Sequence, residues 1–164
     1  MNSTGFYRND DGTLSVQNIN INDLAKKYGT PLFIYDSGLM KERYNAFLEA
    51  TRHLNGNIHY AVKANDALSI ISYFAKLGCG ADIVSIGEFK KCVAAGVSPK
   101  KIIFSGVGKE NSEIEFALKN NVLQFNIESE EELDDIHKIA SKLKIYANIC
   151  LRVNPNIAPN THKK

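Results

Sequence analysis

The chain has 164 residues and a formal net charge of +2, and 44% of its residues are hydrophobic while 23% are charged. This balance is typical of a soluble globular protein, and the charge is too small to indicate a nucleic-acid or membrane partner. The sequence contains no apolar run near the ~20 residues of a membrane span and no signal peptide at its start, so we expect a cytoplasmic protein.

The first thirty residues do not share the pattern of the rest of the chain. Residues 14–16 predict a short strand, and residues 22–28 predict a helix that Gly29 closes. Neither element belongs to the regular alternation that follows. We therefore expect two parts, a lead-in of residues 1–30 and a main domain of residues 31–164.

Six apolar runs predict the strands of the main domain, and from the second run onward they recur roughly every 22 residues. The runs are 32–35, 58–62, 81–84, 102–104, 123–127 and 145–153. Helices are expected between them, at 39–50, 68–77, 85–95, 111–119 and 129–143. Two of these helices begin with a capping box, formed by Ser85 with Glu88 and by Ser129 with Glu132.

Strands that alternate with helices predict an α/β fold with a parallel sheet and right-handed crossovers. Units this short favour a (β/α) barrel, although the pattern leaves a flavodoxin-like open sheet as an alternative. A complete barrel needs eight strands and usually ~250 residues. The sequence supplies five to six such units, so it predicts either an incomplete barrel or a different fold.

Cysteines and histidines give no sign of a metal site. The three cysteines, Cys79, Cys92 and Cys150, are odd in number and widely spaced, which argues against a disulfide framework and a zinc site. We expect all three to be small buried residues. The four histidines show no metal-ligand spacing, so no metal is expected.

Lys63 is the candidate for covalent chemistry. It follows an apolar run, and the carboxyl ends of parallel strands are where such folds bind ligands. Side chains alternate along a strand, so His59, Ala61 and Lys63 are expected on one face, with Ala61 and Ala64 leaving room for a flat ring. In a partly apolar pocket the lysine amine becomes a better nucleophile for an aldehyde, as a Schiff base requires. The alternative is a lysine that ends a strand and points into water.

Two charged residues near other strand ends are weaker candidates. Asp82 could pair with Lys63 or orient a neighbour, or it could be a turn or cap residue. Arg152 could hold a phosphate or a carboxylate, or it could be a surface residue. Glu88 already has a structural role in its capping box. No glycine-rich phosphate loop is recognised.

Four segments in order resemble the diaminopimelate decarboxylase family. They are 31–36 (Pro-Leu-Phe-Ile-Tyr-Asp), 60–65 (Tyr-Ala-Val-Lys-Ala-Asn), 80–88 (Gly-Ala-Asp-Ile-Val-Ser-Ile-Gly-Glu) and 151–155 (Leu-Arg-Val-Asn-Pro). The second is specific to the wider group of ornithine, arginine and diaminopimelate decarboxylases. The last, with the Thr161-His162 loop, favours the diaminopimelate branch.

The resemblance implies a fold-type III enzyme that depends on pyridoxal 5'-phosphate and converts meso-2,6-diaminopimelate to L-lysine and carbon dioxide, a step of lysine biosynthesis. It implies an alanine-racemase-like (β/α)8 barrel with a C-terminal β-domain, which residues 1–30 would join. Lys63 matches the Schiff-base lysine, Asp82 and Glu88 match acidic positions near it, and Arg152 matches an arginine at the cofactor site.

Members of the family are more than twice this long, so the sequence resembles an N-terminal portion that lacks the β-domain. We expect the portion to be inactive alone, and to associate or to need a second chain that supplies the rest; the full-length family is expected to be homodimeric. Two alternatives are a non-catalytic pyridoxal-phosphate barrel protein and a non-functional remnant. Substrate choice within the family is not fixed by these residues.

Overall fold

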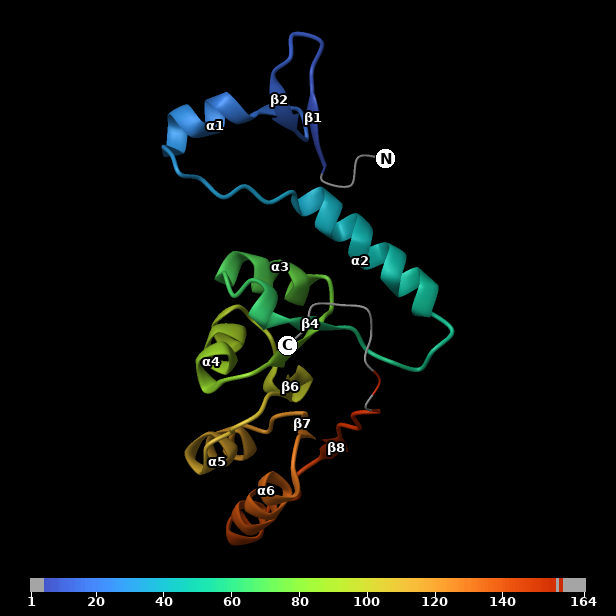
Figure 1. Ribbon diagram of the computed structural model, residues 1–164, viewed down its shortest axis with the longest axis vertical. Helices are drawn as coiled ribbons and strands as arrows, with labels where there is room; N and C mark the ends of the chain where they lie inside the picture. Colours follow the sequence, from blue (N-terminus) through green and yellow to red (C-terminus); the bar gives the residue numbers. More distant parts are fainter. Residues whose placement is uncertain (1–4, 156, 158–164) are drawn as a thin grey trace. The chain divides into compact units, whose positions relative to one another are not determined.

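The structure, a computed structural model, describes residues 5–155 and 157. It divides into two compact units, Met1–Gly56 and Asn57–Lys164 (Figure 1). The boundary after residue 30 expected from the sequence does not coincide with this division, and the assignment of residues 31–56 to the barrel stays a prediction. No helix in the described ranges is long and apolar enough to cross a membrane.

The first unit contains a small antiparallel sheet and two helices. The sheet has the order β1 (Phe6–Arg8), β2 (Leu14–Val16), β3 (Ile19–Asn20), and the helices are α1 (Ile21–Tyr28) and α2 (Ser37–Thr51). Side chains begin both helices: Asn20 accepts a hydrogen bond from the Asn22 N–H at 2.8 Å, and Asp36 accepts one from the Leu39 N–H at 3.0 Å. Both helices therefore begin where local capping chemistry allows.

The strand expected at residues 32–35 is not formed. This segment is irregular and joins α1 to α2, and Phe33 within it is 85% exposed. An apolar run becomes a strand only when another strand pairs with its backbone, and no described strand pairs with this one. The prediction was wrong because the apolar run indicated burial but not a partner.

The second unit is built on a parallel sheet whose five strands lie in chain order. They are β4 (His59–Ala61), β5 (Gly80–Ile83), β6 (Ile102–Phe104), β7 (Gln124–Ile127) and β8 (Ile149–Leu151). Helices follow the strands: α3 (Leu68–Lys76), α4 (Ile86–Ala94), α5 (Asn111–Lys119) and α6 (Glu130–Leu143). Short 3-10 helices lie at η1 (Val62–Ala64) and η2 (Pro99–Lys101).

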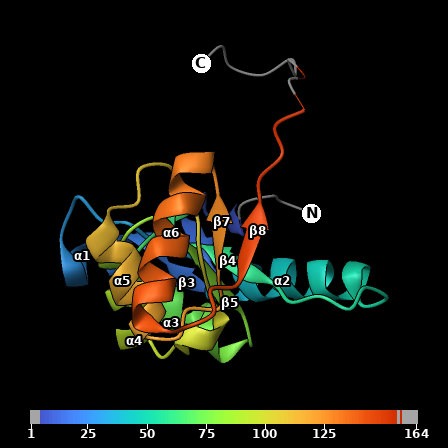
Figure 2. The same cartoon turned by 90° about the horizontal axis from the view of Figure 1, so that it is seen from below.

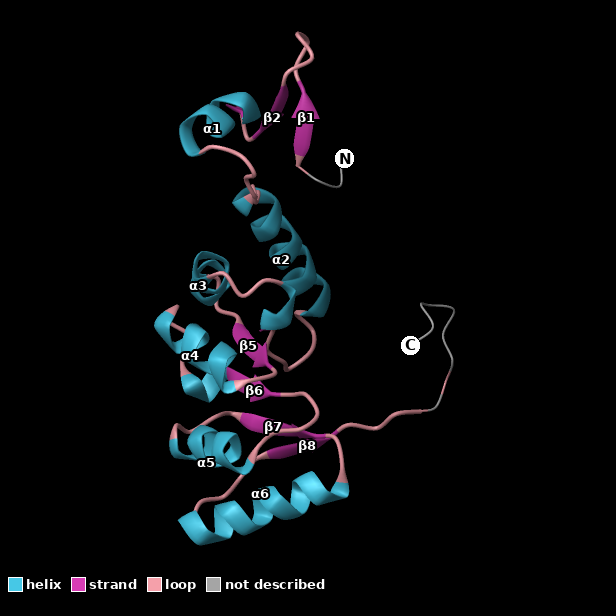
Figure 3. Cartoon of the chain, turned by 60° about the vertical axis from the view of Figure 1, so that its left-hand side comes forward, coloured by secondary structure: helices cyan, strands magenta, loops and turns pink. Residues whose placement is uncertain are grey.

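Strand order and helix placement distinguish a barrel from an open sheet. A flavodoxin-like sheet reverses its strand order and carries helices on both faces. Here the order is sequential, and α3 to α6 all lie along the same face of the strands (Figure 3). Figure 2 shows α6 alongside β7 from another side. The α/β fold with a partial (β/α) barrel is therefore confirmed.

Between this face of the sheet and the helices lies the core. The fully buried side chains include Ile83, Phe104 and Phe125, with the rings of Phe104 and Phe125 stacked at 5.9 Å between centroids. From the helices, Phe89 and Ile114 pack into the same cluster. Every second side chain along a strand is therefore buried against the apolar faces of the helices. The side chains between them point to the other face of the sheet, which is left for polar residues.

Candidate functional site

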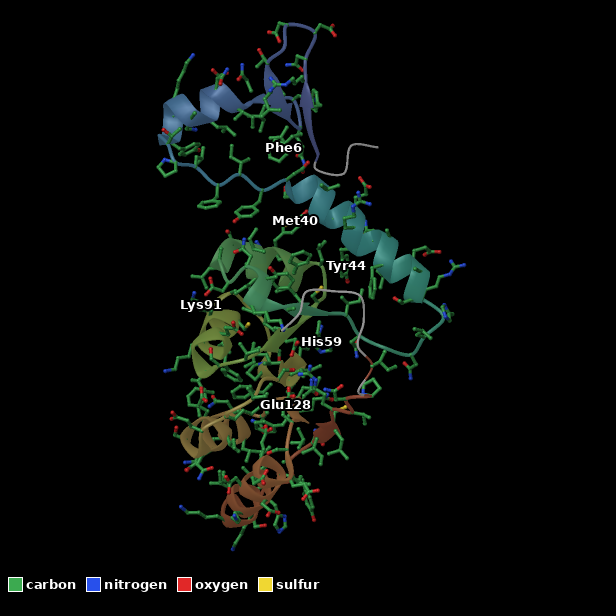
Figure 4. All side chains as sticks on the ribbon, viewed as in Figure 1. Phe6, Met40, Tyr44, His59, Lys91 and Glu128 are labelled. Carbon is green, nitrogen blue, oxygen red and sulfur yellow. The ribbon has the colours of Figure 1, made fainter. Side chains whose placement is uncertain are left out.

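The face of the sheet opposite the helices carries the candidate site. Its strand positions alternate with the buried core positions. They are His59, Ala61, Gly80, Asp82, Ile103, Gln124, Asn126 and Cys150. Because all five strands are parallel, their carboxyl ends lie at one edge, where ligands bind in this class of fold. In Figure 4, the labelled His59 and Glu128 lie toward this open side, whereas Lys91 lies on α4.

Lys63 lies at the carboxyl end of β4, but not on the strand. The strand ends at Ala61, and residues Val62–Ala64 form a 3-10 turn with Val62 buried. The Lys63 side chain is exposed, and no hydrogen bond or ion pair joins it to any residue that the structure describes. Its amine is thus available, while the partly apolar pocket expected around it stays a prediction.

Asp82 lies on the strand next to β4, directly opposite Ala61 in the register. Of the roles that the sequence left open for it, an ion pair with Lys63 is not formed between these two described residues. Instead the Ser105 hydroxyl donates to the Asp82 carboxylate at 2.5 Å. Within the described residues, the hydrogen bond to Asp82 reaches one carboxylate oxygen, Oδ1, so the other oxygen can accept from a ligand.

A chain of hydrogen bonds crosses three strands to reach Asp82. The Gln124 amide donates to the Asn126 side-chain oxygen at 3.0 Å, and the Asn126 amide donates to the Ser105 hydroxyl at 2.8 Å. An amide N–H is a donor only, so the Ser105 hydroxyl keeps its own proton for Asp82. The direction of the bonds therefore makes Asp82 the final acceptor of the chain.

Arg152 follows β8, where its backbone N–H extends the sheet by donating to the Ile127 oxygen at 3.0 Å. Its Nη1 contacts both carboxylate oxygens of Glu128, each at 3.0 Å. The Arg152 side chain is 64% exposed, whereas that of Glu128 is only 11% exposed. Arg152 is thus at the edge predicted for it, held by a carboxylate that the sequence did not indicate.

A second lysine, Lys109, is buried at the same edge of the sheet. We call this edge, formed by the carboxyl ends of the strands and the loops that follow them, the rim. The Lys109 side chain is 1% exposed, and its amine donates to the Gly106 oxygen at 2.7 Å, to the Asn126 oxygen at 3.0 Å and to the Glu132 carboxylate. An ammonium group has three protons, and these three acceptors use them all. The amine also lies 5.5 Å from the centre of the Phe104 ring. Lys109 therefore fastens the loop after β6 to β7 and α6.

Glutamates in the first turns of α4 and α6 hold the backbone of the residues just before these helices. Ser85 and Ser129 accept from the N–H groups of Glu88 and Glu132, each at 3.2 Å, as their capping boxes predict. The return bond goes one residue further back than in a standard box. The Glu88 carboxylate accepts from the Val84 N–H at 2.8 Å, and that of Glu132 accepts from the Glu128 N–H at 2.9 Å.

Glu113 connects two neighbouring helices, α5 and α4. Its carboxylate accepts from the Glu110 N–H at 3.2 Å in its own helix and from the Ile86 N–H at 3.1 Å in α4. Glu88 is therefore structural, as its capping box predicts. The resemblance places Glu88 at an acidic position near Lys63, and that role stays a prediction.

His59 and Gly80 form a close pair at the amino ends of β4 and β5. They face each other in the register, and a side-chain carbon on Gly80 would collide with the His59 ring and with the Lys101 backbone oxygen. Glycine at residue 80 thus gives the imidazole its space on the open face.

The cysteines differ in their surroundings. Cys79 and Cys92 are buried and free, as expected, and burial raises the pKa of the Cys92 thiol to about 12. Cys150 is exposed, so its predicted burial was wrong. It pairs with Asn126 in the register and lies on the same open face of the sheet. Across the described ranges, no group of three or more histidine, cysteine or acidic side chains could hold a metal ion.

The donors at this edge fit an aldehyde cofactor that carries anionic groups. Lys63 offers an amine, with Ala61 and Ala64 as small neighbours. Asp82 offers one carboxylate oxygen to a cationic group, and Arg152 offers guanidinium N–H groups to an anion. His162 and the 161–162 loop lie outside the described residues.

Sequence reasoning missed four of these residues, Ser105, Asn126, Glu128 and Lys109, and it missed the second role of Glu132 as a partner of Lys109. The alternation of Gln124, Phe125, Asn126 and Ile127 was a usable signal for a polar open face. For Lys109 no local signal exists, because a lysine that follows two glycines in a loop has the pattern of a solvent-exposed residue.

Comparison with known proteins gives a consistent family. Residues 37–164 match the pyridoxal binding domain of the pyridoxal-dependent decarboxylases. The diaminopimelate decarboxylase of Vibrio cholerae is 41% identical over 157 residues, which are 96% of this chain and 38% of that protein. That of Helicobacter pylori strain J99 is 48% identical over 143 residues, or 87% of this chain and 35% of that one.

Solved structures agree in fold. The crystal structure of diaminopimelate decarboxylase from M. jannaschii in complex with L-lysine aligns with a TM-score of 0.90 and 36% identity, over 99% of this chain and 39% of that one. The Helicobacter pylori enzyme complexed with L-lysine aligns with a TM-score of 0.84 and 46% identity, over 87% of this chain and 36% of that one. The chain thus spans less than two fifths of the length of the relatives it matches.

Proposed function

Because the chain belongs to the family of pyridoxal-dependent decarboxylases, we propose that it supplies the lysine-bearing section of a diaminopimelate decarboxylase. In this proposal Lys63 holds pyridoxal 5'-phosphate, and Asp82 and Arg152 contact the cofactor. The substrate is meso-2,6-diaminopimelate, and the product is L-lysine. The relatives named diaminopimelate decarboxylase, at 41% to 48% identity, support this substrate class.

The contrast between two lysines at one edge of the sheet carries the proposal. Lys109 is buried and its three protons are donated to protein acceptors, so its amine cannot attack a carbonyl without breaking the rim. Lys63 lies after β4 with no partner in the described ranges. Of these two amines, Lys63 is the one placed to bind an aldehyde.

The chain's own groups have defined tasks in this proposal. When bound, the cofactor acts as the electron sink for the carbanion that decarboxylation leaves. Lys63 holds it through the amine. Asp82, fixed by Ser105, offers a carboxylate oxygen to a cationic group, while Arg152 offers N–H donors to an anionic one. The hydrogen-bond chain from Gln124 keeps the Asp82 carboxylate oriented before any ligand arrives.

Borohydride trapping tests the proposal directly. The 164-residue chain is mixed with pyridoxal 5'-phosphate, reduced with borohydride, digested, and the labelled peptide is mapped by mass spectrometry. We expect the label on Lys63 in the wild-type chain, and none at this peptide in Lys63→Arg, which keeps the positive charge but removes the reactive amine. Lys76→Arg, on the exposed side of α3, is the matched control and should leave the label unchanged.

Labelling spread over exposed lysines, with no preference for Lys63, would contradict the proposal. Substrate choice and completeness need a second measurement. We propose that the chain releases carbon dioxide from meso-diaminopimelate only when a polypeptide that supplies the rest of the barrel and the β-domain is present. We also propose that residues 1–30 join that β-domain and that the complete protein is a homodimer.

A further inference from the structure

We infer that Glu128 is a positioning residue that grips one end of the Arg152 guanidinium, so that its other edge faces a ligand and binds an oxyanion. The oxyanion is the phosphate of the cofactor or a carboxylate of the amino-acid substrate. This inference rests on the proposed function, because it places Arg152 at the same ligand site as Lys63.

The geometry of the ion pair leaves part of the guanidinium unused. Only Nη1 of Arg152 contacts Glu128, with both carboxylate oxygens at 3.0 Å. The Nη2 and Nε N–H groups make no hydrogen bond within the ranges that the structure describes. Arginine recognises carboxylate or phosphate through two parallel N–H groups, and the Nη2–Nε edge supplies such a pair.

A residue that positions Arg152 must itself be held in place, and Glu128 is held by burial and by a backbone hydrogen bond. Its side chain is 11% exposed, and its backbone N–H donates to the Glu132 carboxylate at 2.9 Å. That carboxylate in turn contacts Lys109, whose side chain is 1% exposed. A series of contacts thus leads from the buried Lys109 ammonium to the exposed Arg152 guanidinium, through Glu132 and then Glu128.

The register places the pair at the ligand edge. Ile127 and Leu151 are the last paired residues of β7 and β8, and Glu128 and Arg152 follow them directly. Arg152 is held there by a backbone bond as well, from its N–H to the Ile127 oxygen at 3.0 Å. An arginine side chain that is already held at one end has lost part of its conformational entropy before the ligand arrives. Binding then costs less entropy than it would for a freely moving side chain.

The test measures how much pyridoxal 5'-phosphate half-saturates the borohydride adduct on Lys63. We expect Glu128→Ala and Arg152→Lys each to raise this concentration by about tenfold, the effect of losing one charge-assisted hydrogen bond. Glu130→Ala is the matched control, because it removes an exposed negative charge two residues away on α6 and should change the value less than about twofold.

Arg152→Lys separates binding from structure, because a lysine amine can keep the ion pair with Glu128 but lacks the second donor edge. A merely structural pair would leave the affinity of Arg152→Lys for both pyridoxal 5'-phosphate and meso-diaminopimelate at the wild-type value, and that result would overturn the inference. Thermal melting of each variant is followed in parallel, and we expect Arg152→Lys to melt with the wild type.

Two further ligands identify the oxyanion. If the phosphate is bound, both variants lose affinity for pyridoxal 5'-phosphate but not for pyridoxal. If a carboxylate is bound, they lose calorimetric affinity for meso-diaminopimelate on the cofactor-loaded chain. Unchanged affinity for all three ligands overturns the inference while the proposed function stands. Absence of any Lys63 adduct in the wild-type chain overturns the proposed function and the inference with it.

Discussion

The two compact units differ in how they bury apolar side chains. In the second unit a contiguous cluster of sheet and helix residues, including Ile83, Phe104 and Phe125, is buried. In the first unit neither helix has a buried residue, and Val16 is its one buried hydrophobic side chain in the described range. Phe33 and Phe47 are exposed there instead.

The difference teaches what holds each unit together. Burial of apolar surface is the main favourable term in folding, so the second unit has its own source of stability. The first unit depends on the hydrogen bonds of its turns, helix caps and three-stranded sheet. Each such hydrogen bond or cap typically contributes about 1 kcal/mol to the free energy of unfolding. We therefore expect the effects of substitution to be large in the second unit and small in the first.

The largest effect is expected from the core. Phe104→Ala removes a ring with no exposed surface, and we expect the free energy of unfolding to fall by about 3–5 kcal/mol. Phe33→Ala in the first unit should change it by less than about 0.5 kcal/mol. Urea denaturation followed by circular dichroism measures both. Equal losses would break the comparison, because they would show that Phe33 is buried in solution.

A nearly equal effect is expected from the buried ion pair. Lys109→Met leaves the Glu132 carboxylate without its cation in a site that is 9% exposed, which should cost about 3–5 kcal/mol. The first unit offers a control in Lys26, which lies 3.9 Å from Asp23 with both side chains exposed. Lys26→Met should cost at most about 1 kcal/mol in the same denaturation experiment. A small loss for Lys109→Met would contradict its role in fastening the rim.

Substitution of a glycine in each unit is expected to change stability by an intermediate amount and so extends the comparison. Gly80→Ala places a carbon against the His59 ring and the Lys101 backbone oxygen, and we expect a loss of about 1–3 kcal/mol. An added carbon at Gly56 meets nothing within 4 Å, so Gly56→Ala should stay within about 0.5 kcal/mol of the wild type. Melting temperatures of the two variants provide the measurement. A Gly80→Ala variant as stable as wild type would show that the strands shift apart easily.

The smallest effect concerns two exposed carboxylates, one in each unit. The hydrogen bond from the Thr13 backbone N–H lowers the pKa of Asp11, and the hydrogen bond from the Lys119 amine lowers the pKa of Glu115. Each lowered pKa stabilises the fold above the pKa of the unfolded carboxyl, and this contribution is lost as the pH falls through the folded pKa. NMR titration of the carboxyl carbons should find both below their ordinary values. An ordinary value for Asp11 alone would show that its turn does not persist in solution.

Much of the second unit could be predicted from its sequence, because there the local and tertiary signals agree. The five apolar runs from residue 58 onward correspond to β4 to β8, and α5 has the bounds expected for it. Residues 32–35 have the same composition but no partner strand. Composition alone cannot distinguish an apolar segment that pairs from one that does not.

The candidate site was predictable only in part. Lys63 was found through a motif, and Arg152 through its place after an apolar run. The contacts of Asp82 depend on Ser105, which directly follows β6, and on Asn126 of β7; these residues meet only through the register of β5, β6 and β7. The turn that carries Lys63 depends on where β4 ends, and an apolar run fixes such a boundary only to within a few residues.

The returning glutamates close two of the strand-to-helix connections, β5 to α4 and β7 to α6, by a hydrogen bond within one short segment. In residues 84–88 and again in residues 128–132, the carboxylate that closes the turn and the N–H that it holds are four positions apart in one segment. The closing hydrogen bond of each turn is thus local, and one contact from outside supports it: the Glu113 carboxylate accepts from the Ile86 N–H, and the Lys109 amine donates to Glu132. Such a joint should be portable when its outside contact travels with it: residues 84–88 with Glu113, or residues 128–132 with Lys109, would give protein engineers a corner for assembling chimaeric barrels.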